Sequence, residues 1–293
     1  MGFSKPHRPL LFITILAIFL QSSTAANTDY TNFIFKGCAK QNFQDPTGIY
    51  SQNLKNLLQS LVSQSSQKNF ASTTSGDGQN AIMGLYQCRG DLSTAQCYTC
   101  VTKILDMMKK LCGEVIALRV QLSGCYLKYE IVGFKQESGT ELLFKVCGST
   151  RASGAGFDEL RDSGLAAMVS GVKNGFYTGD YQRVFVLGQC ESDLSSGDCG
   201  SCLKSGVESV KDECGESISG QVYLQKCFLS YSYYPNGVPT INAGSEVVGT
   251  KNHTQRTVAI AVGGVAALGF LVVFLMFVRS ILKKRKGKHD GWN

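Results

Sequence analysis

The chain has 293 residues and a formal net charge of +7, which is carried by its two ends. Lys5 and Arg8 lie near the start, and residues 279–293 hold six basic residues against one acid, so the region between the ends is neutral. A charge excess of this kind indicates membrane orientation and gives no support to nucleic-acid binding.

The first 26 residues have the pattern of a secretory signal peptide. A charged start precedes the apolar residues 10–20, and small residues surround a cleavage site near Ala25 or Ala26. A membrane-spanning signal anchor is the alternative, but this apolar run is short for a bilayer. We therefore expect the chain to be exported.

The twelve cysteines fall into two sets with one spacing pattern. Cys88-x8-Cys97-x2-Cys100-x11-Cys112-x12-Cys125 returns 102 residues later as Cys190-x8-Cys199-x2-Cys202-x11-Cys214-x12-Cys227, and Cys38 and Cys147 lie upstream of the two sets. Four constant spacings between five cysteines indicate an internal duplication. In an exported chain the cysteines predict disulfides, although their number alone leaves many pairings open.

Residues 27–135 are expected to form a first module that begins with a strand at 32–35. Leu54, Leu57, Leu58, Leu61 and Val62 recur at helical spacing, which predicts an amphipathic helix over residues 50–65. Residues 70–80 are rich in Ser, Thr and Gly and predict a loop.

The rest of the first module predicts a strand, a helix and two closing strands. Residues 81–87 form the strand before Cys88, and a capping box over residues 93–96 opens a helix that extends to about Lys110. Residues 114–121 and 124–132 predict the closing strands.

Residues 141–234 are expected to form a second module with the same order of elements. Residues 144–147 repeat the end of the first strand, Leu165 and Met168 mark the first helix, and residues 195–198 form a second capping box. The first two cysteines are seven residues closer together than in the first module. We expect that difference in the first helix or the loop after it, where insertions are tolerated.

The C-terminal part predicts a membrane anchor. Residues 235–257 form a polar stalk with a glycosylation sequon at Asn252, and residues 258–278 are 21 residues without a charge, long enough to span a bilayer as a helix. The basic residues 279–293 then form a cytoplasmic tail, which leaves the N-terminus extracellular. Within the span, Ala259, Gly263 and Ala267 are small residues at a spacing that allows two helices to associate.

The sequence argues against an enzyme, a cofactor and a metal site. The three histidines are His7, His253 and His289, so neither module contains one, and histidine-dependent catalysis or metal binding within a module is excluded. Cys97-x2-Cys100 could be half of a zinc site or a redox pair, but in an exported chain the structural disulfide reading is favoured.

The repeated Cys-x8-Cys-x2-Cys blocks resemble the ginkbilobin-type plant cysteine-rich domain, also called the stress-antifungal domain. The resemblance implies an α+β fold with two tandem modules, each with two helices packed on a five-stranded antiparallel sheet, plus one transmembrane helix. It also implies three disulfides per module, namely Cys38–Cys112, Cys88–Cys97, Cys100–Cys125, Cys147–Cys214, Cys190–Cys199 and Cys202–Cys227.

Two such domains followed by a span and a short tail are similar to the plasmodesmata-located protein family. The resemblance implies a type I protein of the plasma membrane at plasmodesmata that modulates cell-to-cell trafficking, through callose deposition and the docking of viral movement proteins. It implies a role in plant defence and homo- or hetero-oligomers with related proteins. A lectin-like sensor of wall or microbial carbohydrate is the alternative function.

The resemblance also implies a sugar site, because a single-module relative binds mannose through an Asn, an Arg and a Glu. Ala39 replaces the Asn in the first module, whereas Arg119 and Glu130 fit the pattern. None of the three is kept in the second module. An ion pair between neighbouring strands is the alternative explanation of Arg119 and Glu130.

Overall fold

The computed structural model describes residues 30–133, 138–152 and 155–239, which belong to one compact unit. The predicted signal peptide, most of the stalk, the span and the tail lie outside the described residues. No helix within the described part of the chain is long and apolar enough to cross a membrane.

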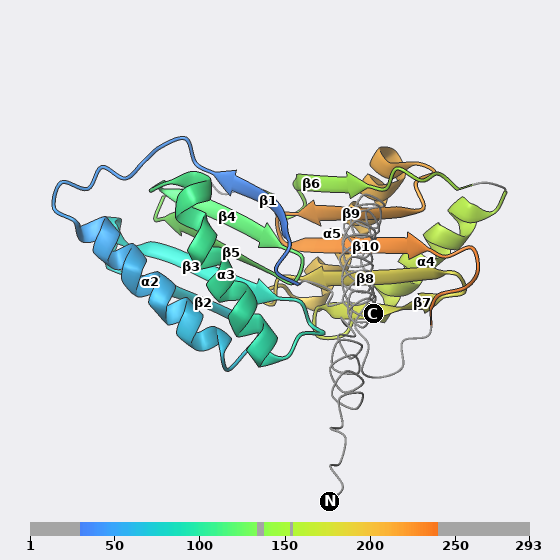
Figure 1. Cartoon of the computed structure of the whole chain (residues 1–293), viewed down its shortest axis with the longest axis horizontal. Helices are drawn as coiled ribbons and strands as arrows, with labels where there is room; N and C mark the ends of the chain where they lie inside the picture. The colour runs from blue at the N-terminus through green and yellow to red at the C-terminus, as the bar shows by residue number, and fades with distance from the viewer. Residues whose placement is uncertain (1–29, 134–137, 153–154, 240–293) are drawn as a thin grey trace, which may run out of the picture. The chain divides into compact units, whose positions relative to one another are not determined.

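Each module is an α+β unit with five strands and two long helices, as predicted (Figure 1). The elements of the first are β1 (Phe33–Cys38), α2 (Ile49–Ser65), β2 (Phe70–Ser75), the 3-10 helix η1 (Gly78–Asn80), β3 (Ile82–Cys88), α3 (Thr94–Cys112), β4 (Ala117–Leu122) and β5 (Cys125–Ile131). Those of the second are β6 (Leu142–Cys147), α4 (Phe157–Gly171), β7 (Phe176–Tyr181), β8 (Val184–Cys190), α5 (Ser196–Cys214), β9 (Ser219–Leu224) and β10 (Cys227–Tyr233).

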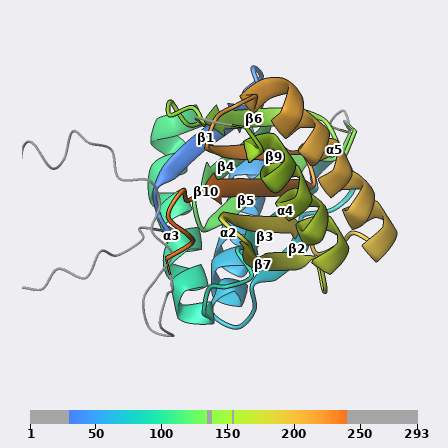
Figure 2. The same cartoon turned by 90° about the vertical axis from the view of Figure 1, so that its right-hand side faces the viewer.

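The two sheets share one antiparallel topology. The strand order is β1-β4-β5-β3-β2 in the first module and β6-β9-β10-β8-β7 in the second. Figure 1 shows α2 and α3 side by side on one face of the first sheet, and Figure 2 shows α4 and α5 over one face of the second. Each sheet therefore has a face covered by helices and an opposite face without them.

The core of each module lies between the helices and the sheet. In the first module the buried Leu57 and Leu61 of α2 and Ile104 of α3 pack against Leu127 of β5. Gly84 of β3 permits this approach, because a Cβ there would lie 2.8 Å from the Leu57 side chain. Alternate residues of a strand point to opposite faces, so the other half of each strand's side chains is available for a second contact.

The two capping motifs begin α3 and α5 in similar ways. Ser93 accepts a hydrogen bond from the Gln96 backbone N–H, and the Gln96 side chain accepts one from the Ser93 backbone N–H, which completes the capping box. Ser195 accepts from the Asp198 backbone N–H at 3.2 Å, but the shorter Asp198 side chain binds the Ser195 hydroxyl instead. The second helix start is therefore held by one fewer backbone contact.

One expectation about the first module was wrong, and the structure shows where the insertion expected near the first helix lies. Residues 70–75 form the edge strand β2 and not a loop, and they pair with β3 along their length. Of the seven extra residues between the first two cysteines, four lie between Phe70 and Cys88, where a loop with η1 replaces the tight turn between β7 and β8. Only three lie between Cys38 and Phe70. The insertion is thus shared between the α2 region and the hairpin after it.

Candidate functional site

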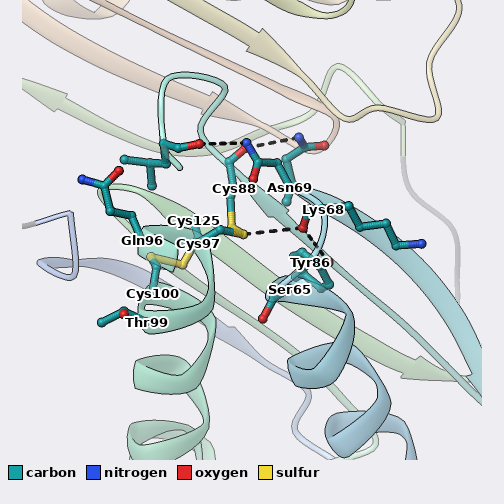
Figure 3. The surroundings of a disulfide bond; sticks show 12 residues. Ser65, Lys68, Asn69, Tyr86, Cys88, Gln96, Cys97, Thr99, Cys100 and Cys125 are labelled. Carbon is teal, nitrogen blue, oxygen red and sulfur yellow. Dashed lines mark hydrogen bonds between the residues drawn. A yellow bond between two sulfur atoms is a disulfide. The ribbon is translucent and has the colours of Figure 1, made fainter. Parts of the chain in front are cut away.

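Six disulfides hold the helices α3 and α5 to their sheets, and they join the pairs that the resemblance implies. The bonds are Cys38–Cys112, Cys88–Cys97, Cys100–Cys125, Cys147–Cys214, Cys190–Cys199 and Cys202–Cys227. Figure 3 shows the two bonds at the start of α3, where Cys97 and Cys100 reach β3 and β5. The cysteines of the Cys-x2-Cys motif are therefore structural in this conformation.

Metal ligands and cavities are the next features of the described residues to consider. Within them, no three His, Cys, Asp or Glu side chains are grouped so that they could hold a metal ion. A cavity of about 270 Å³ lies between the end of α4 and the start of α5, and Val172, Asn174 and Leu194 are among its lining residues. Its one charged lining residue, Glu191, is already engaged in ion pairs.

The contact between the two modules is polar, and one part of it is built from residues at duplicated positions. Gln189 donates to the Cys88 carbonyl at 2.9 Å and accepts from the Gly90 backbone N–H at 3.1 Å. Gln87, which is 102 residues before Gln189, accepts from the backbone N–H and hydroxyl of Ser192 at 3.0 and 2.9 Å. Ser192 is likewise the counterpart of Gly90.

An aromatic pair continues this self-matching contact. Phe35 and Phe144 each stand three residues before the first cysteine of their module, and their rings stack with centroids 5.0 Å apart. The equivalent surfaces of the two modules thus pair with each other, as the subunits of a two-fold dimer do. We call this region the inter-module contact.

Another part of the inter-module contact is an asymmetric charged cluster around Glu191. Its side chain is 1% exposed and lies 3.0 Å from the Lys128 ammonium of the first module and 3.2 Å from that of Lys226. The Tyr126 hydroxyl donates to the same carboxylate at 2.5 Å. A buried carboxylate needs partners of this kind, because desolvation without them is costly.

The ionisation of this cluster follows from its surroundings. Burial alone would raise the pKa of Glu191, but the charge of Lys128, the hydrogen bonds from Tyr126 and Lys128, and the charge of Lys226 together lower it. Burial and the charge of Glu191 raise the pKa of Tyr126 well above its usual value, which keeps the hydroxyl a donor. The cluster is therefore stable as a charged acid between two cations.

The structure places the two candidate sugar residues on neighbouring strands but in different settings. Arg119 donates to the Gln225 carbonyl of the second module at 2.7 Å, and its guanidinium lies 4.1 Å from the centre of the Tyr126 ring. Glu130 pairs across the sheet with Ala117, while Lys128 stands opposite Arg119. Arg119 is thus part of the inter-module contact. Asn252, Ala259, Gly263 and Ala267 lie outside the described residues.

Sequence reasoning missed the inter-module contact. Gln87, Gln189 and Glu191 were assigned no role, because single polar residues in strands and loops predict solvent-facing positions. The one available signal was that Gln87 and Gln189 match at the offset of 102 residues, beside cysteines that match as well. That signal predicts a shared role and says nothing of what the side chains contact.

Comparison with known proteins identifies the family. A family model described as "Salt stress response/antifungal" matches residues 37–131 and 146–234. Plasmodesmata-located protein 1 of Arabidopsis thaliana is 53% identical over 92% of this chain and 94% of its own, and plasmodesmata-located protein 2 of the same plant is 49% identical over 92% of each. The chain belongs to the plasmodesmata-located proteins, a family with tandem salt stress response/antifungal domains.

A solved structure agrees with the fold. The crystal structure of the tandem DUF26 ectodomain from the Arabidopsis thaliana cysteine-rich receptor-like protein PDLP8 is 32% identical, with a TM-score of 0.65. It covers 69% of this chain and 98% of the solved one. The two-module architecture is therefore the architecture of an experimentally observed relative.

Proposed function

We propose that the chain is a non-enzymatic membrane protein of plasmodesmata that modulates cell-to-cell trafficking. The observation that carries the proposal is the 53% identity to plasmodesmata-located protein 1 over almost the full length of both chains. In this proposal the protein is a type I protein of the plasma membrane, with its modules outside the cell and a short basic tail inside. It acts through callose deposition, and viral movement proteins dock on it.

The inter-module contact supports a role as a recognition scaffold. Because polar residues, stacked rings and a buried ion cluster join the modules, the ectodomain presents both helix layers to partners as one body. A binding protein benefits from such preorganisation, because less ordering is needed when the partner binds.

Spread of a mobile fluorescent protein between plant cells tests the proposal. Raising the amount of this chain should lower the number of neighbouring cells that the fluorescent protein reaches and should raise callose staining at the cell borders. A matched version that ends at residue 257 would export the modules without the predicted anchor. This version should leave spread unchanged. Unaltered spread with the full chain would contradict the proposal.

The alternative is a lectin-like surface sensor, and the position of Arg119 bears on it. A sugar that used Arg119 would have to displace its hydrogen bond to the Gln225 carbonyl. Calorimetric titration of the full chain with mannosides decides the matter, with Arg119→Ala as the control. A heat of binding that is present in the unmodified chain and absent in Arg119→Ala would favour the sensor. Equal and negligible heat in both proteins would favour the trafficking role.

A further inference from the structure

The two copies of the duplication carry opposite charge. The first module, residues 30–133, has ten basic and six acidic residues, a net charge of +4. The described residues of the second module, within 138–239, have eight basic and twelve acidic residues, a net charge of −4. The neutral ectodomain is therefore a pair of oppositely charged halves, and surfaces of opposite sign attract within about a Debye length, ~10 Å at 0.1 M salt.

Much of this charge lies on the helices, on the side of each sheet away from the inter-module contact. The helices α2 and α3 carry four lysines and one aspartate, a net charge of +3. The helices α4 and α5 carry seven acids and three basic residues, a net charge of −4. The inter-module contact uses strand and loop residues such as Gln87 and Gln189, so it leaves both helix layers uncovered.

The sign of the charge is reversed at one equivalent position near the end of the duplicated helix. Lys110 in the last turn of α3 corresponds to Asp212 in the last turn of α5, 102 residues later. A cation at a helix C-terminus is favoured by the helix dipole, and an acid there is disfavoured by roughly 0.3–1 kcal/mol. Asp212 is exposed and has no ion-pair partner among the described residues. The stability of the module therefore does not explain Asp212.

The acids of the second module converge where α4 begins and α5 ends. Arg161 is buried between Asp158 and Asp162, at 2.9 Å from each, and Lys211 lies 3.2 Å from Glu208 and 4.0 Å from Asp162. Of these pairs only Lys211–Asp162 joins the two helices, and the acids remain in excess over the two cations. We call Asp158, Asp162, Glu208 and Asp212 the acidic end.

The first module carries the complementary surface. Lys103, Lys109 and Lys110 are exposed on α3, and we call them the basic face. Lys109 lies 3.3 Å from Glu114, and the side chains of both remain largely in solvent, which makes this pair a weak competitor. The face bears three cations against one nearby acid on the same helix, Asp106.

We propose that the basic face of one molecule binds the acidic end of a second copy of the same chain, in a head-to-tail contact between neighbours. The two surfaces differ, so the contact is heterologous and can repeat from molecule to molecule. Anchoring the copies in one membrane would raise their effective concentration, so that weak exposed ion pairs suffice. The contact is separate from the predicted helix face at Gly263 and does not depend on the trafficking role.

Energy transfer between full-length copies in neutral phosphatidylcholine vesicles tests the contact. Donor- and acceptor-labelled chains should show transfer at ~0.1 M salt that is lost at ~1 M, where the Debye length falls to ~3 Å. Lys103→Glu with Lys110→Glu makes both faces acidic, and Glu208→Lys with Asp212→Lys makes both basic. For either variant alone, the surface density that gives half-maximal transfer should rise about tenfold, or ~1.4 kcal/mol.

Mixing the two variants gives the decisive result. Each reversed face then meets an opposite face on the other variant, so transfer should return to within about twofold of the unmodified chain. Lys40→Glu and Asp180→Lys reverse exposed charges outside the two surfaces and serve as matched controls without effect. The proposal would be overturned if the energy transfer did not depend on salt concentration. It would also be overturned if mixing the two variants failed to restore the transfer. The proposal would likewise be overturned if the basic face bound an added polyanion such as polyglutamate but did not bind a second copy of the chain.

Discussion

Glu191 differs in charge from its counterpart in the first module. Its counterpart 102 residues earlier is Arg89, which pairs with Asp91 of its own module at 2.6 Å. Glu191 instead meets Lys128 and Tyr126 of the other module. The inter-module contact is therefore symmetric at Gln87 and Gln189 and asymmetric at Glu191, and charged pairs of this kind determine which surfaces meet.

Glu191→Ala should lower the free energy of unfolding by about 3 kcal/mol, because the ammonium groups of Lys128 and Lys226 lose their shared carboxylate partner. Glu191→Gln, which keeps an acceptor of the same shape, should cost less. Denaturant unfolding of the disulfide-bonded chain measures both. Equal stability of all three proteins would show that the cluster is not a stabilising contact.

The pH dependence of this contribution follows from the lowered pKa of Glu191. In the folded chain the pKa lies below the ordinary value of 4.5, so the charged form stabilises the fold above that pH, and the contribution is lost as pH falls through the folded pKa. The difference in unfolding free energy between the unmodified chain and Glu191→Gln should therefore be constant near neutral pH and shrink below about pH 4. A difference that grows on acidification would reverse the sign of the argument.

At the scale of elements, most of the fold could be predicted because its signals are local. The helical spacing of Leu57 and Leu61 and the capping box at Ser93 located α2 and the start of α3 to within a residue. The sequence did not predict strand β2, because an edge strand with a single buried residue, Ala71, has no alternating apolar pattern. Its Ser and Thr residues are compatible with both a loop and an exposed edge.

The two helix starts allow a matched test of capping. Ser93→Ala removes both the acceptor for the Gln96 backbone N–H and the geometry of the full capping box, and should cost about 1–2 kcal/mol. Ser195→Ala removes a single backbone hydrogen bond and should cost about 0.5–1 kcal/mol. Thermal unfolding of the two variants compares them directly. A larger loss at Ser195 would contradict the assignment of the caps.

For the whole molecule, the sequence predicts two modules but not how they join. The apolar pattern of each module accounts for its own core. The inter-module contact depends on side chains such as Gln87 and Arg119, which in the sequence look like ordinary polar residues of strands. The disulfide pairs and the sheet come from the family resemblance, since spacing left other pairings open. The sugar hypothesis stays a prediction: Arg119 fits the motif, and in the structure its guanidinium donates to the Gln225 carbonyl.

Gly90 tests whether the two modules act as one body. A Cβ at this position would lie 2.5 Å from the Phe176 ring of the other module, so Gly90→Ala should strain the inter-module contact by about 1–3 kcal/mol. Gly37→Ala is the control, since nothing lies within 4 Å of a Cβ there. Limited proteolysis should cut between residues 133 and 138 faster in the first variant only. Equal cleavage rates would mean that the contact does not restrain the modules.

The position of the protein in plant tissue tests the central functional claim most directly. A full-length chain with a fluorescent protein fused to its C-terminus should appear as spots at the borders between cells, and these spots should coincide with callose stain. The relatives' identity over 92% of the chain is the basis of this expectation. A uniform signal over the cell surface, without enrichment at callose-stained sites, would contradict the plasmodesmal assignment.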